Sequence, residues 1–160
     1  MKNGTSHRCF ISYIDKSREY YKAHGYEQPY SWAHNTDSPF STLKAPLGES
    51  RIGLVTTADR PPLDSQRKTR LFTAPNSESG SLHRDKFWDK NATHTDDPES
   101  FLPVQRMQEF ANEGRIGSLS SRFYGVPTDY SQRNTRDEDA PQIEAWLRED
   151  QVDAAILLPL

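Results

Sequence analysis

The hydrophobic pattern of the chain predicts a small set of β-strands. Residues 51–57 (RIGLVTT) are short and rich in β-branched side chains, which is typical of a strand. Residues 153–158 (DAAILL) are apolar after the first residue, as in a parallel strand buried on both faces. Residues 116–124 predict a short strand, or a tight turn followed by a strand. We therefore expect a sheet whose most apolar strand comes last in the sequence.

Three stretches have the spacing of apolar residues that predicts amphipathic helices. They are 12–24, followed by Gly25; 103–113, followed by Gly114; and a third helix that opens on a capping box of Thr135 and Glu138 and carries Ile143, Trp146 and Leu147 on one face. Together with the strands, this order predicts an open α/β sheet with crossover connections.

The segments between these elements predict long loops. Residues 26–48 combine aromatic residues with prolines, which favours an extended arm over a simple linker. Residues 58–83 have no periodicity, so we expect a loop there. The predicted fold is a small, open, mostly parallel α/β sheet with covering helices that needs a partner to complete its core. We place an N-terminal helix and aromatic arm at 1–50 and the α/β core domain at 51–160.

Composition narrows the function classes. Hydrophobic residues make up 33% of the chain and charged residues 27%, with a formal net charge of −3 and no long basic face, so we expect no nucleic-acid partner. No apolar run approaches the ~20 residues of a membrane helix, and the first residues lack the apolar core of a secretory signal. We expect a cytoplasmic protein without a membrane partner. The single Cys9 excludes an internal disulfide and a cysteine-based zinc cluster.

The densest group of chemically useful side chains is His94, Asp96 and Asp97. An imidazole close to carboxylates can transfer protons, so we predict these three as catalytic residues. The same groups can ligate a divalent metal, with His94, Asp97 and His83 as candidate ligands, although the sequence does not name the cofactor. The alternative is a turn before Pro98, in which these residues cap the following helix.

Two further pairs predict contacts with a small-molecule substrate. Thr56 and Thr57 end the first strand, where open α/β sheets bind ligands. Arg122 and Tyr124 can bind a carboxylate group. The alternatives are that the threonines only terminate the strand, and that Arg122 and Tyr124 pack over an interface.

A series of short motifs resembles the selenoprotein B family of the glycine, sarcosine and betaine reductases. The motifs are Tyr13-Ile14-Asp15-Lys16-Ser17-Arg18-Glu19-Tyr20-Tyr21, Leu54-Val55-Thr56-Thr57-Ala58, Glu113-Gly114-Arg115-Ile116-Gly117-Ser118-Leu119, Arg122-Phe123-Tyr124 and Val152-Asp153-Ala154-Ala155. They occur in order over most of the chain. The resemblance implies reductive cleavage of a carbon–nitrogen bond in a small amine by a selenocysteine or cysteine, together with a partner protein.

In that resemblance the selenocysteine or cysteine segment would lie after Pro159, and Cys9 matches no thiol of the family pattern. We therefore expect a half-enzyme whose redox thiol comes from a second subunit carrying cysteine or selenocysteine. Two alternatives remain: a self-contained homo-oligomeric enzyme that uses the His94, Asp96 and Asp97 group, and a module that binds a small molecule without converting it.

Overall fold

The computed structural model describes residues 13–28, 33–60, 71–82, 94–126 and 131–160. The chain forms two compact units, Met1–Pro39 and Phe40–Leu160. In the first unit, helix α1 (Tyr13–Ala23) confirms the predicted N-terminal helix. Gly25 follows it with a φ of 85°, a left-handed conformation that glycine adopts without steric cost. No helix in the described ranges is long and apolar enough to cross a membrane.

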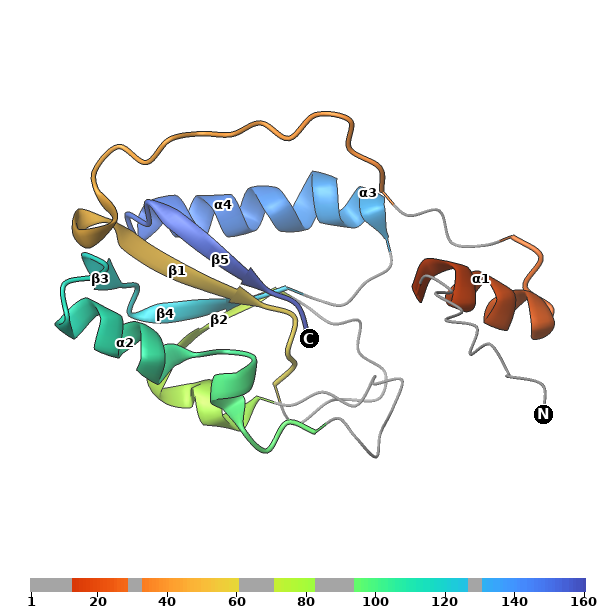
Figure 1. Cartoon of the computed structure of the whole chain (residues 1–160), viewed down its shortest axis with the longest axis horizontal. Coiled ribbons are helices and arrows are strands. Elements are labelled where there is room, and N and C mark those ends of the chain that lie inside the picture. The colour runs from red at the N-terminus through yellow and green to blue at the C-terminus, as the bar shows by residue number, and fades with distance from the viewer. Residues whose placement is uncertain (1–12, 29–32, 61–70, 83–93, 127–130) are drawn as a thin grey trace, which may run out of the picture. The chain divides into compact units, whose positions relative to one another are not determined.

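The second unit is built on an open five-stranded sheet (Figure 1). Its central strand, β1 (Arg51–Thr56), is parallel to β3 (Ser118–Leu119) and β4 (Arg122–Gly125) on one side and to β5 (Ala154–Leu158) on the other. Strand β2 (Phe72–Pro75) is antiparallel to β4. The α/β class and the mostly parallel sheet are therefore confirmed, and the turn and strand predicted in 116–124 correspond to β3 and β4.

Two helices cover opposite faces of the sheet (Figure 1). The side chains of β1 alternate between these faces, as in any strand. Ile52 and Leu54 pack in the cluster that includes Met107 of α2 (Val104–Asn112). Val55 packs with Tyr124 and with Ile143 of α4 (Ala140–Glu149). The predicted apolar faces of both helices are thus confirmed.

The prediction of a loop over residues 58–83 was wrong for the second half of this segment. It contains β2 and a 3-10 helix, η2 (Asn76–Ser81), with Phe72 stacked edge-on against Phe123 at 6.2 Å between ring centroids. The strand is short and ends on Pro75, so its sequence shows no clear alternation of apolar and polar residues that would predict a strand. Its pairing with β4, a strand distant in sequence, is what stabilises it.

The predicted capping box of Thr135 and Glu138 was also wrong. The helix starts earlier, with α3 (Gln132–Asn134), and Ser131 is its N-cap, since the Ser131 hydroxyl accepts the Asn134 N–H at 3.2 Å. Thr135–Asp139 forms a π-helical turn in which the Ala140 N–H donates to the Thr135 carbonyl. A wide turn of this kind accommodates Pro141, which lacks an N–H and crowds the carbonyl four residues before it.

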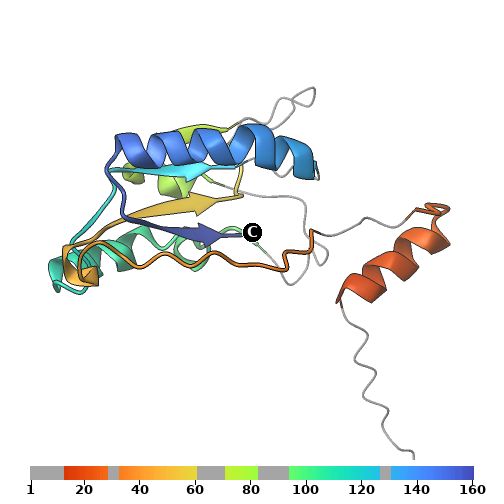
Figure 2. The same ribbon diagram turned by 90° about the horizontal axis from the view of Figure 1, so that it is seen from above.

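Strand β5 corrects the prediction of a strand buried on both faces. It lies next to β1 at the edge of the sheet, and among the described strands β1 is its one neighbour (Figure 2). Ile156 is 37% exposed and Leu157 is 71% exposed. The buried residues of the cluster under α4 come from β1, β4 and the helix itself, so the described part of the chain leaves the α4-facing side of β5 largely exposed at Leu157. Apolar composition alone does not distinguish a central strand from an edge strand.

Candidate functional site

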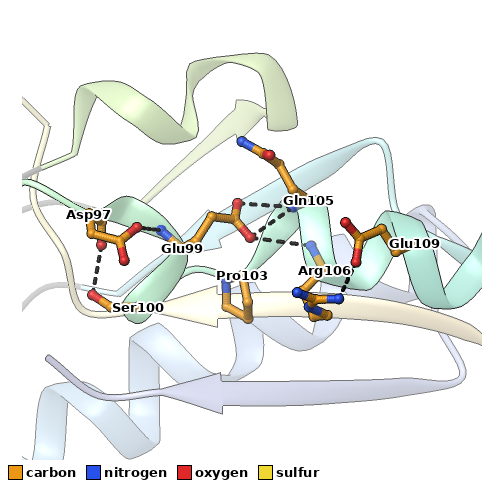
Figure 3. Close-up of a pocket in the computed structure, with 7 residues that line it drawn as sticks. All are labelled: Asp97, Glu99, Ser100, Pro103, Gln105, Arg106 and Glu109. Carbon is orange, nitrogen blue, oxygen red and sulfur yellow. Dashed lines mark hydrogen bonds and ion pairs between the residues drawn. The ribbon is translucent and has the colours of Figure 1, made fainter.

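A pocket of about 340 Å³ lies at the amino end of α2 (Figure 3). The short helix η3 (Pro98–Ser100) leads into it. The lining residues are Asp97, Glu99, Ser100, Pro103, Gln105, Arg106 and Glu109. One of the three predicted catalytic residues, Asp97, is among them.

Asp97 has a structural role in this pocket. Its side-chain Oδ1 accepts the Glu99 N–H at 3.1 Å, and its carbonyl accepts the Ser100 hydroxyl at 2.7 Å. These bonds make Asp97 the N-cap of η3, as in the turn that the sequence offered as an alternative. The cap also fixes the carboxylate at the rim of the pocket.

The carboxylate of Glu99 caps α2. It accepts the Gln105 N–H at 2.9 and 3.1 Å and the Arg106 N–H at 3.2 Å (Figure 3). The first N–H groups of a helix have no partner within the helix, and a negative charge there interacts favourably with the helix dipole. The residue preceding the helix, Pro103, provides no side-chain cap, so Glu99 takes that role from outside the helix.

We expect Glu99→Ala to lower the free energy of unfolding by about 1 kcal/mol, because two N–H groups lose their acceptor. Urea unfolding followed by far-UV circular dichroism measures this. Glu113→Ala is the matched control, since Glu113 is exposed, lies after α2 and pairs only loosely with Arg115 at 3.8 Å. Equal losses in the two variants would show that the cap contributes nothing.

The pocket is negatively charged overall. Asp97, Glu99 and Glu109 contribute three carboxylates, against one guanidinium from Arg106, which is ion-paired with Glu109. Carboxylates held by hydrogen bonds favour a cationic ligand over an anionic one. An ammonium group fits this charge better than a free carboxylate does.

The other members of the predicted His/Asp group lie in solvent. The side chains of His94 and Asp96 are 66% and 88% exposed, and His94 Nδ1 lies 3.6 Å from Asp96 Oδ2. Over the described ranges, no three His, Cys, Asp or Glu side chains come together as a metal site. His83, the other predicted ligand, lies outside the described residues.

Thr56 and Thr57 lie at the carboxyl end of β1, and contacts within the chain engage both hydroxyls. Thr56 is fully buried and accepts the Ala58 N–H at 3.1 Å. The Thr57 hydroxyl accepts the Leu160 N–H at 2.8 Å and lies 3.3 Å from the Leu160 carbonyl. Thr57 thus fastens the segment that follows β5 to the end of β1, whereas the Thr56 hydroxyl bonds to the turn that leaves its own strand.

Arg122 and Tyr124 belong to a hydrogen-bonded network centred on Asp150. The Arg122 Nε donates to Asp150 Oδ2 at 2.6 Å, and the Tyr124 hydroxyl donates to the same oxygen. Arg51 donates to the Asp150 carbonyl at 2.8 Å. This network ties β1 and β4 to the turn between α4 and β5, at the amino ends of the parallel strands.

The structure therefore does not bring the four predicted substrate contacts together. Thr56 and Thr57 lie at one end of the parallel strands, and Arg122 and Tyr124 are engaged at the other. Sequence reasoning did not identify Asp150 as the centre of this network. The residue follows the last turn of a helix, and nothing local in the sequence pairs it with β4.

The network shifts the pKa of each of its side chains. Burial raises the pKa of Tyr124 to about 12, and the nearby Asp150 carboxylate adds to this effect. Partial burial opposes ionisation of Asp150, but hydrogen bonds from Arg122 and Tyr124 outweigh it and hold the pKa of Asp150 below its usual value. The hydrogen bond to Asp150 raises the pKa of Arg122, which stays protonated.

This shift predicts an alkaline loss of stability. The folded pKa of Tyr124 lies above the ~10 of an unfolded tyrosine, so its contribution is complete below about pH 10 and is lost as the pH rises to about 12. The stability advantage of the wild type over Tyr124→Phe should therefore shrink across this range in guanidinium titrations. Tyr26→Phe, at a residue 64% exposed, is the control and should show no such change. A constant difference for Tyr124→Phe would contradict the prediction.

Comparisons with known proteins identify a family. Residues 78–159 match the model of the glycine/sarcosine/betaine reductase selenoprotein B family. No curated protein and no solved structure matches the chain. The matched residues run from η2 to β5 and include the acidic pocket and, of the Asp150 network, Arg122, Tyr124 and Asp150. Arg51 and the motifs in residues 13–58 lie outside them. This match covers just over half of the residues of the chain, and the chain therefore belongs to the glycine/sarcosine/betaine reductase selenoprotein B family.

Proposed function

We propose that this chain is one component of a selenoprotein B-like reductase and that a second polypeptide supplies the redox-active cysteine or selenocysteine. The family match supports a reductase component. The family resemblance implies that a cysteine or selenocysteine carries out the reductive cleavage of a carbon–nitrogen bond. The one cysteine of the sequence, Cys9, lies outside the residues that match the family.

The observation that carries the proposal is the open edge of β5. Residues 154–158 contain no charged side chain, and Leu157 is 71% exposed. Proteins usually protect a sheet edge with charges, prolines or bulges, since bare N–H and C=O groups recruit another strand. An apolar and uncharged edge suits strand addition by a partner chain.

The acidic pocket at α2 supports a small amine as the substrate class. Its carboxylates favour an ammonium group, and a cavity of about 340 Å³ lies within the usual range of small-molecule sites. The catalytic role predicted for His94, Asp96 and Asp97 is kept as part of this proposal, and Asp97 is the member of the group that lines the pocket. Contacts of the substrate with Thr56, Thr57, Arg122 and Tyr124 remain predictions. In the structure these side chains form hydrogen bonds within the chain, and a substrate would have to compete with those bonds.

The test is reconstitution with a separately purified thiol-bearing chain, taken from the neighbouring reading frame. The mixture should release ammonia from glycine, or the corresponding methylated amine from sarcosine or betaine, with dithiothreitol as the reductant, and neither chain alone should do so. Leu157→Lys should weaken binding of the two chains by at least tenfold in calorimetry, since it places a charge on the strand edge.

Leu47→Lys is the matched control for this substitution. Leu47 is 50% exposed but lies before β1, away from the β5 edge, so its replacement should leave binding unchanged. Amine release by this chain alone would overturn the proposal. A mixture of the two chains that neither binds nor reacts would also overturn it. A homo-oligomer of this chain that forms equally well with Leu157→Lys would show that association does not use the β5 edge, and would overturn it too.

A further inference from the structure

We draw no further inference here: the strongest candidate, the open apolar edge of β5 around Ile156 and Leu157, already serves as the association surface of the proposed function, and nothing in the structure shows which strand covers it.

Discussion

Replacing Asp150 with alanine is expected to lower the free energy of unfolding by about 2–4 kcal/mol. The substitution removes one acceptor of Arg122, which keeps its ion pair with Glu149, and the charged acceptor of the fully buried Tyr124. Hydrogen bonds to charged groups contribute about 1.5–3 kcal/mol each, and removing one partner of a fully buried ion pair costs about 3–5 kcal/mol. We expect less than the sum, because the Arg122 and Asp150 side chains are 26% and 20% exposed and water can partly replace the lost contacts.

Urea unfolding at pH 7 measures this loss, and an exposed ion pair provides the control. Arg148 bonds to Glu144 at 2.6 Å, but their side chains are 78% and 62% exposed. Pairs of this kind contribute about 0.3–0.5 kcal/mol, so Arg148→Ala should change little. If Asp150→Ala were no more destabilising than Arg148→Ala, the network would not hold the sheet to the turn between α4 and β5.

A second large effect is expected at Gly117, which packs against the backbone that enters β1. A Cβ atom at this position would lie 2.4 Å from the carbonyl carbon of Glu49 and 2.7 Å from the nitrogen of Ser50. The Gly117 N–H also donates to the carbonyl of Ser50 at 2.9 Å. Backbone atoms cannot move aside as a flexible side chain can, so Gly117→Ala must separate β3 from the start of β1.

We expect Gly117→Ala to destabilise the protein by about 2–3 kcal/mol, in the range typical of overpacked sites. The same urea experiment measures it. Gly80→Ala is the matched control, since a Cβ atom there meets nothing within 4 Å and the backbone is not left-handed. Equal stability of the two variants would mean that the backbones of β3 and of the segment before β1 do not need this close approach.

The two large effects lie at neighbouring places in the fold. Gly117 sets the distance between β3 and the start of β1, and Asp150 anchors β1 and β4 to the turn before β5. Both therefore act on the amino ends of the parallel strands. The proposed association surface, by contrast, is the outer edge of β5. Substitutions at Gly117 and Asp150 therefore test the stability of the fold, whereas Leu157→Lys tests association with a partner chain.

Local periodicity correctly placed most of the regular elements. The β-branched run of β1 and the apolar faces of α2 and α4 depend on residues close in sequence, and the structure confirms them. The left-handed glycine after α1 was predictable for the same reason, since Gly25 ends the helix through its own backbone conformation. The family resemblance was also visible in the motifs from Glu113 to Ala155, which lie inside the residues that match the family.

The candidate site was less accessible to sequence reasoning. Asp97 does line the acidic pocket, but the Glu99 carboxylate reaches the N–H groups of Gln105 and Arg106 across six and seven residues. No local rule predicts that reach. The pairing of Arg122 with Asp150 spans 28 residues and depends on the turn after α4 returning to the amino end of β4.

By itself, the sequence determined the helices, the central strand and the family, because these depend on local spacing and on motifs in order. Only the tertiary structure decided that β5 is an exposed edge, that β2 pairs with β4, and that the hydrogen bonds of the predicted substrate contacts are made at opposite ends of the parallel strands. Each of these features depends on which distant segment packs beside a residue. An apolar strand has the same composition at the centre of a sheet and at its edge, and only its neighbours distinguish the two.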